Sequence, residues 1–271
     1  MWHFKKHISI AFIIVVCISC SEPEVIIPPL EVPTSGKKVL VEDLTGVRCP
    51  NCPSANARLE AIKSIYGDNV IILGVHGNLL TRPLDENIYD FRSPAAMELE
   101  ASYIPILGKP SAVINRKSHP EFNMLANPLQ DQWQIIIERE LQLIQRLIIE
   151  MALVPNDTGY DLNIGLLPQE DLGDGFRIHC FISENNIVDA QEDVDRIIPD
   201  YIHNHVLRAI ITPIEGTVIE EPLEEGILIN TSISLQSNQI QPFTSIENID
   251  IIIAVTQENG AVEEVNLIHI N

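Results

Sequence analysis

The feature that most constrains this chain is a pair of cysteines two residues apart at the start of an expected helix. Residues 38–45 form an apolar, β-rich run, residues 49–52 read CPNC, and residues 54–66 have the amphipathic spacing of a helix. Residues 69–76 are a second apolar run, typical of a buried strand. The sequence therefore predicts a strand–helix–strand unit with the cysteine pair where the first strand leads into the helix.

A CxxC pair is compatible with a zinc half-site, a structural disulfide or a redox-active pair. The other CxxC of the 271 residues, Cys17 to Cys20, lies in the N-terminal segment that precedes the folded part, so the folded part has no second CxxC, which weighs against structural zinc. At a helix N-terminus, free N–H groups and the helix dipole stabilise a thiolate at Cys49, and Cys52 is placed to resolve a mixed disulfide. Cys180 lies within an expected strand and is interpreted as a small buried hydrophobe.

The N-terminus has the features of an export signal. Positive charge precedes an apolar run at residues 8–18, which is shorter than a membrane span. A serine precedes Cys20 and a polar stretch follows it, as in a bacterial lipoprotein site. We expect a signal peptide at 1–19, lipid on Cys20 and a proline-rich tether at 20–36. An ordinary secretory cut, or lipidation at Cys17, remains an alternative.

Charge and motifs remove several classes of function. The chain has 17 Lys and Arg residues against 38 Asp and Glu residues, a formal charge of -21, which repels phosphate backbones and argues against nucleic-acid binding. GxSxG, P-loop, HExxH and Rossmann glycine motifs are all absent from the sequence. Hydrolase and nucleotide-dependent activities lose their main support, and we expect neither a cofactor nor a metal.

The order strand, CxxC, helix, strand resembles the thioredoxin superfamily. That resemblance implies a cis-proline beside the disulfide, matched by Pro110 directly before an apolar run. It also implies a buried carboxylate that assists proton transfer, matched in spacing by Asp43, for which the adjacent Glu42 is a competitor. By this resemblance Cys49 is the nucleophile, Cys52 resolves, Pro110 shapes the substrate groove and Asp43 handles the proton.

Two residues depart from the thioredoxin pattern. Arg48 stands where an aromatic residue usually precedes the first cysteine, and the proline of the pair is Pro50 rather than the residue next to Cys52.

A narrower resemblance covers residues 39–53, which look like the twenty-eight-kilodalton outer membrane protein family. Residues 108–116 and 203–208 extend the similarity into both halves of the chain. Members are bacterial outer-membrane lipoproteins with a thioredoxin-like part, so the resemblance implies a lipid-anchored protein of the cell outer membrane. The family has no settled activity that it could lend to this chain.

The expected fold class is an α/β thioredoxin-like domain at 37–150 followed by an all-β, immunoglobulin-like sandwich domain at 151–271. An insertion at 77–105 is expected near the CxxC edge, with a helix near 93–103, and the strongest helix signal covers 128–150. Seven strands are expected in the second part, at 160–167, 176–183, 203–212, 217–221, 227–235, 249–256 and 262–270.

His203 and His205 are two residues apart, which on a strand places both imidazoles on one face. That spacing suits a metal or a pH-sensitive contact, but the sequence shows no acidic or cysteine partner for them. A structural role is the simpler interpretation.

Two functions compete at this point. In the first, the protein is a tethered thiol–disulfide oxidoreductase acting on protein thiols or disulfides, which requires an exposed Cys49 sulfur. In the second, it is a noncatalytic surface lipoprotein that binds a protein or glycan partner, and the CxxC is a structural disulfide. A buried or covered cysteine pair would favour the second.

Overall fold

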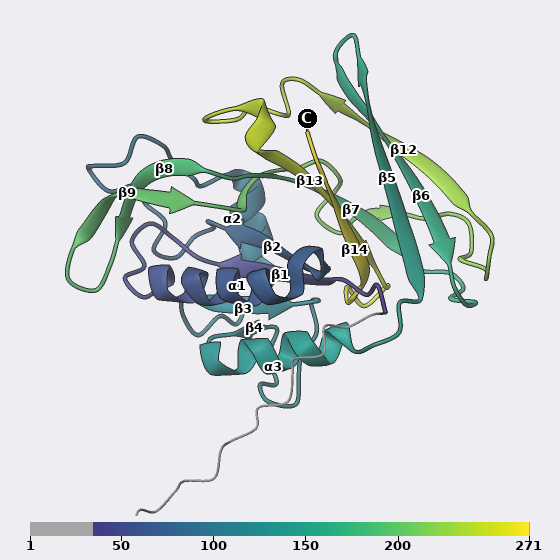
Figure 1. The fold of residues 1–271 in the computed structure, drawn as a ribbon, viewed down its shortest axis with the longest axis horizontal. Coiled ribbons are helices and arrows are strands. Elements are labelled where there is room, and N and C mark those ends of the chain that lie inside the picture. The colour runs from purple at the N-terminus through teal and green to yellow at the C-terminus, as the bar shows by residue number, and fades with distance from the viewer. Residues whose placement is uncertain (1–34, 271) are drawn as a thin grey trace, which may run out of the picture. The chain divides into compact units, whose positions relative to one another are not determined.

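The computed structural model describes residues 35–270 (Figure 1). The expected signal peptide at 1–19, the lipidation site at Cys20 with its alternative at Cys17, and nearly all of the expected tether lie outside the described residues. Within 35–270, no helix combines the length and apolar character needed to cross a membrane.

The strand–helix–strand unit predicted around the cysteines is confirmed. β1 (Val39–Leu44) and β2 (Val70–Val75) are buried throughout and pair in parallel, and α1 (Cys52–Tyr66) connects them through the short 3-10 helix η1 (Gly67–Asn69). One stripe of α1 is buried, because its apolar side chains recur every three or four residues. The stripe consists of Cys52, Ala55, Leu59, Ile62 and Tyr66.

The next segment adds two helices and two strands. α2 (Pro94–Ala101), expected from the sequence, begins at Ser93, whose side chain accepts a hydrogen bond from the Ala96 amide at 3.0 Å. β3 (Ser111–Ile114) runs antiparallel to β1 and pairs with the two-residue β4 (Ala126–Asn127), and α3 (Gln130–Leu141) follows.

The helix expected at 128–150 is wrong beyond Leu141. Residues Leu147–Asn156 form β5, which pairs along its whole length with β6 (Gly159–Pro168). The spacing of the apolar residues in this segment fits both the period of a helix and that of a strand, and its β-branched isoleucines favour a strand. As strand residues, Leu147 and Ile149 pack in the core formed with β6, β7 and β13.

The seven strands expected after residue 150 are present, most with bounds shifted by a few residues. They are β6, β7 (Arg177–Glu184), β10 (Val206–Ile210), β11 (Thr217–Val218), β12 (Ile229–Gln236), β13 (Ile249–Thr256) and β14 (Val262–His269), with the 3-10 helix η2 (Ile246–Asn248) before β13. The hairpin of β8 (Ile187–Glu192) and β9 (Ile197–His203) was not predicted.

Strands from before and after residue 150 share one sheet. Across residues 35–270 this nine-stranded sheet has the order β14-β13-β7-β10-β2-β1-β3-β4, with β11 beside β7, and β12-β6-β5 form a separate three-stranded sheet (Figure 1). The isoleucine-rich core between β7, β13 and the smaller sheet gives this β-rich part a sandwich-like arrangement.

The two faces of β1 enter different cores. Val39 and Val41 pack with α1 and α3, whereas Leu40 and Leu44 pack on the opposite face with α2. Because side chains alternate along a strand, the neighbouring carboxyl groups of Glu42 and Asp43 also lie on opposite faces.

Candidate functional site

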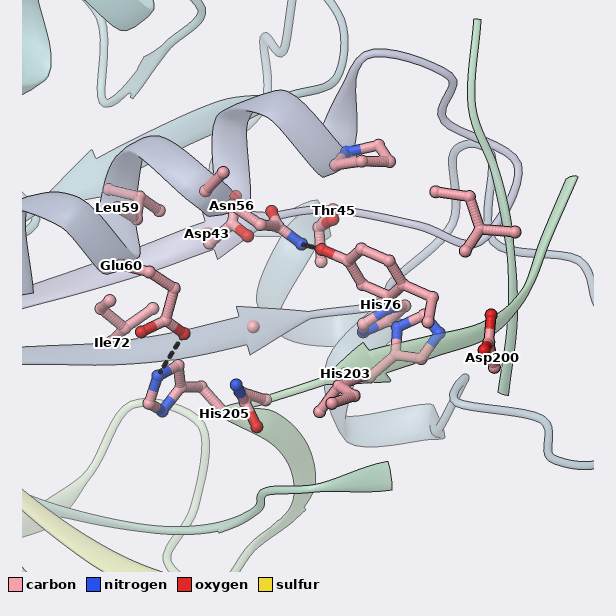
Figure 2. Close-up of a pocket in the computed structure, with 17 residues that line it drawn as sticks. Asp43, Thr45, Asn56, Leu59, Glu60, Ile72, His76, Asp200, His203 and His205 are labelled. Atoms are coloured by element: carbon pink, nitrogen blue, oxygen red, sulfur yellow. Dashed lines mark hydrogen bonds and ion pairs between the residues drawn. The ribbon is translucent and has the colours of Figure 1, made fainter. Parts of the chain in front are cut away.

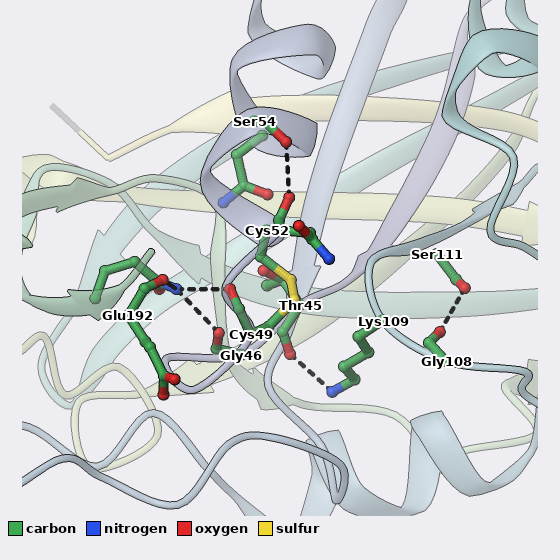
Figure 3. Close-up of a disulfide and its surroundings, with 12 residues drawn as sticks. Thr45, Gly46, Cys49, Cys52, Ser54, Gly108, Lys109, Ser111 and Glu192 are labelled. Carbon is green, nitrogen blue, oxygen red and sulfur yellow. Dashed lines mark hydrogen bonds between the residues drawn. A yellow bond between two sulfur atoms is a disulfide. The ribbon is translucent and has the colours of Figure 1, made fainter. Parts of the chain in front are cut away.

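Cys49 and Cys52 form a disulfide at the start of α1, with their Cα atoms 5.3 Å apart (Figure 3). The zinc half-site is thus not the state that this structure describes. Cys180, the free cysteine among the described residues, is buried in β7, as expected, and burial raises its pKa to about 12. Such a thiol is inert in disulfide exchange at neutral pH.

The disulfide is covered, which contradicts the expectation of an exposed Cys49 sulfur. Both cysteines are 0% exposed. From β8, the Gln191 side-chain amide donates to the Gly46 and Cys49 carbonyl oxygens, both at 3.2 Å, and the Glu192 amide donates to the Val47 carbonyl at 2.8 Å. The unpredicted β8–β9 hairpin is therefore fastened to the CxxC turn.

The insertion between β2 and α2 also lies against the CxxC turn, as expected. The Arg48 amide donates to the Leu80 carbonyl at 2.9 Å, and the Arg48 guanidinium donates to the carbonyls of Arg82 and Pro83 at 2.9 and 2.7 Å. A Cβ atom on Gly46 would lie 2.3 Å from the Leu80 oxygen, so only glycine permits this approach. Arg48 thus anchors the insertion.

Pro110 follows a cis peptide bond at the start of β3, as the thioredoxin resemblance implied. The preceding Lys109 extends toward the disulfide turn, where its ammonium donates to the Thr45 carbonyl at 2.7 Å (Figure 3). The same ammonium pairs with Glu100 of α2 at 2.6 Å, and burial lowers the pKa of Lys109. Lys109 is a charged neighbour of the site that the sequence interpretation missed.

Glu42 is fully committed to an ion pair. Its carboxylate receives two hydrogen bonds from the Arg116 Nε, both at 3.1 Å, and one from Nη2 at 2.6 Å, on the face of the sheet that α2 covers. The Arg116 guanidinium also lies over the Phe181 ring, 5.5 Å from its centre. Glu42, the competitor for the proton-transfer role, therefore already has a structural one.

Asp43 faces α1 and lacks a charged partner in contact. The Asn56 side-chain amide makes three hydrogen bonds in one of its two orientations. In that orientation its nitrogen donates to Asp43 Oδ2 (2.9 Å) and to the Cys52 carbonyl (3.1 Å), and its oxygen accepts from the Tyr201 hydroxyl (3.2 Å). Asp43 Oδ1 is buried with no hydrogen-bond partner. Burial raises the pKa of Asp43 to about 7, an increase that the charge of Lys109 opposes.

A pocket of about 350 Å³ lies between α1, the ends of β1 and β2, and β9 (Figure 2). Asp43 forms part of its wall, and so do two buried histidines, His76 at the end of β2 and His203 at the end of β9. Burial lowers the pKa of His203 to about 4, and burial with nearby His203 and Lys109 lowers that of His76 well below its usual range. Both imidazoles are neutral at pH 7.

The expectation that His203 and His205 share a strand face is wrong. β9 ends at His203, and His205 has a left-handed backbone (φ 58°) in the tight connection to β10. His203 points into the buried pocket region, whereas His205 pairs with Glu60 of α1 at 3.1 Å. Within residues 35–270 no group of three or more His, Cys, Asp or Glu side chains has an arrangement suited to a metal ion.

His76 and the β8–β9 hairpin were missed by sequence reasoning. His76 directly follows a buried strand, and side chains at the carboxyl ends of parallel strands commonly line ligand sites, which is a signal that could have selected it. The hairpin offered less, because its Ile197–His203 segment contains a proline and an aspartate.

Comparison with known proteins identifies the family. The profile of outer membrane protein Omp28 matches residues 97–271, more than half of the chain. The chain belongs to the outer membrane protein Omp28 family. The matched residues include Pro110 and the buried His203, whereas the CxxC turn lies before them.

Solved structures support the same overall fold. HBP35 of Porphyromonas gingivalis is similar with a TM-score of 0.64 at 16% identity, covering 86% of this chain and 75% of its own. A crystal structure of an Agrobacterium tumefaciens protein is similar with a TM-score of 0.52 at 15% identity, covering 87% and 95%. No curated protein sequence matches the chain. At these identities the likeness concerns fold alone.

Proposed function

We propose that this Omp28 family protein is held in the outer membrane by lipid on Cys20 and carries out thiol–disulfide exchange through Cys49 and Cys52. In this proposal residues 37–150 are a thioredoxin-like domain and residues 151–271 an immunoglobulin-like sandwich that extends its sheet. The support is the element order from β1 to α3, the parallel β1–β2 pair, and the cis-proline before β3.

The observation that carries the proposal is the buried Asp43 carboxyl, whose Oδ1 has no hydrogen-bond partner and whose Oδ2 is linked through the Asn56 amide to the Cys52 carbonyl. A static disulfide has no use for a buried acid whose Oδ1 lacks a partner, because such a group destabilises the fold. A carboxyl with a pKa of about 7 is, by contrast, suited to exchanging a proton with a thiol at neutral pH.

In the proposed reaction the bonded cysteines act as the oxidant for one turnover. A thiolate of a protein dithiol attacks Cys49 Sγ, the Cys49–Cys52 bond breaks, and Cys52 leaves as a thiolate that takes the Asp43 proton. The second substrate thiol loses its proton to solvent and attacks the mixed disulfide, which releases Cys49 as a thiolate at the N-terminus of α1. The substrate is oxidised by two electrons and the cysteine pair is reduced.

The second candidate is a structural disulfide in a partner-binding lipoprotein, and the 0% exposure of both cysteines favours it. For exchange, the turn has to be uncovered, so the Gln191 hydrogen bonds from β8 must open. The two candidates therefore differ in whether the cover opens on the timescale of a reaction.

The test is the reduction potential of the pair, measured by glutathione equilibration and thiol alkylation, together with turnover of a reduced, unfolded protein substrate. Exchange predicts a potential of roughly -270 to -120 mV, and loss of turnover in Cys49→Ser. Gln191→Ala should speed reduction by dithiothreitol, while the surface variant Gln169→Ala should not. A potential below roughly -300 mV with no turnover would establish the structural candidate.

A further inference from the structure

The pocket that Asp43 lines has a composition that neither disulfide exchange nor membership of the family explains. Its walls include Leu59 of α1, Ile72 of β2, and Ile198 and Ile202 of β9 (Figure 2). Ile202 is 56% exposed and Ala57 of α1 is exposed, so this part of the lining is open to solvent. An elongated apolar group would lie along these side chains.

The polar lining is acidic or neutral throughout. Asp43, Glu60 and Asp200 contribute carboxyl groups, and none of the lining residues is Lys or Arg. Lys109 acts on Asp43 from outside the pocket, where Glu100 already neutralises it. A bound cation would therefore meet Asp43 and Asp200 without a Lys or Arg on the wall, whereas Glu60 is already paired with His205, which also lines the pocket.

Three buried atoms on this wall have no hydrogen-bond partner: Asp43 Oδ1, His76 Nδ1 and His203 Nε2. Both imidazoles are buried and neutral at pH 7. A neutral imidazole that donates through one nitrogen accepts through the other. His76 Nδ1 and His203 Nε2 are acceptors in the tautomers that carry the proton on the other ring nitrogen, and buried acceptors without donors are rare in folded proteins.

We propose that this pocket binds an amphipathic amine: an apolar stem along the isoleucine walls, ending in an ammonium group that donates to Asp43, His76 and His203. An alkylammonium has three donors and no acceptor, which matches the three unpartnered acceptors in number and kind. The Tyr201 ring on the same wall adds a face that attracts cations. The ligand is a lysine side chain of a protein or a free alkylamine, and its binding does not require disulfide exchange.

The experiment uses the full mature chain with its disulfide intact and measures binding of pentylamine by histidine C–H chemical shifts and calorimetry. Pentanol, which has the same stem without the charge, is the ligand control. Losing hydrogen bonds to a charged group costs roughly tenfold or more in affinity, so pentylamine should bind at least about that much more tightly than pentanol.

Two variants localise the site. Ala57→Trp fills the exposed lining, whereas Ala61→Trp places the same side chain on exposed α1 surface outside the pocket. Ala57→Trp and Asp43→Asn should each weaken pentylamine binding by about tenfold or more, and Ala61→Trp should leave it unchanged. Equal binding of pentanol and pentylamine, no saturable binding, or no effect of Ala57→Trp would overturn the proposal.

The two sources of amine are separated by one further comparison. Tighter binding of a lysine peptide than of pentylamine identifies a protein lysine as the ligand, and the reverse order identifies a free amine. Either order supports the proposed site, because both require the same acidic pocket and the same three acceptors.

Discussion

The two faces of β1 treat neighbouring carboxyl groups in opposite ways. On the α2 face, Glu42 receives three hydrogen bonds from Arg116, so its charge is matched at close range. On the α1 face, Asp43 has an amide donor and a bare Oδ1, and its pKa rises to about 7. The difference teaches that a buried acid is not by itself a functional one: Glu42 holds the sheet together, and Asp43 is left able to exchange a proton.

Removing the Glu42 charge should have the largest effect on stability. Glu42→Gln leaves the buried Arg116 guanidinium without its counter-charge, which costs about 3–5 kcal/mol. Urea unfolding at pH 7 measures it. The matched control is Glu121→Gln, because the Glu121–Arg139 pair has the same chemistry at 2.7 Å but is exposed to solvent, and its loss should cost much less than loss of the Glu42 charge. Equal losses of unfolding free energy in the two variants would show that burial does not strengthen the Glu42–Arg116 pair.

Asp43→Asn should instead stabilise the protein, and increasingly so as pH rises. The folded pKa of about 7 exceeds the ordinary value of 3.8, so the folded state keeps a proton that the unfolded state loses between these values. Wild-type stability therefore falls from about pH 4 to pH 7, and the variant avoids that loss. The gain reaches about 4 kcal/mol above pH 7, at 1.36 kcal/mol per pKa unit.

Unfolding curves from pH 4 to 8 check this second prediction, with the exposed Asp85→Asn as a control that should show no such trend. A variant that is uniformly less stable than the wild-type protein would mean that Asp43 is structural, like Glu42.

Removing the disulfide should have an intermediate effect. It closes a loop of only four residues, so the chain-entropy account gives a loss of about 2 kcal/mol for the double variant Cys49→Ala and Cys52→Ala. Wild-type protein unfolded in the presence of a reducing agent should show a similar loss. A much larger loss would indicate that the bond clamps the β8 cover, which would support the structural candidate.

The smallest effect is expected at the rim of the pocket, where Glu60 pairs with His205. Its side chain is 44% exposed, so Glu60→Gln should change the free energy of unfolding by less than about 1 kcal/mol. The hydrogen bond from His205 lowers the pKa of Glu60, so this contribution is present near neutral pH and is lost as pH falls through that pKa. Unfolding at pH 6 and pH 3 measures it.

The local elements around the cysteines could be predicted from sequence because their signals are local. An apolar run, a CxxC and an amphipathic stretch each specify their own structure, and β1, α1 and β2 appear where these patterns place them. The proline before β3 is likewise local. What the periodicity could not supply was the end of α3, because residues 142–150 satisfy helix and strand spacing alike until β6 selects the strand.

The pocket could not be predicted because its parts meet only through tertiary contacts. Asp43 and His203 are 160 positions apart in the sequence but line the same pocket. The β8–β9 hairpin, which carries His203, is held against the CxxC turn by hydrogen bonds from Gln191 to two backbone carbonyls. Nor could the sequence choose between Glu42 and Asp43. The choice required knowing which face of β1 meets Arg116.

The most direct test of the account is a carbon NMR titration of the Asp43 carboxyl in the oxidised protein, assigned by comparison with Asp43→Asn. The account predicts a midpoint near pH 7, because burial without a contacting charge partner disfavours the carboxylate. A midpoint near the ordinary value of 3.8 would contradict it, because Asp43 would then hold no proton to give to Cys52 at neutral pH.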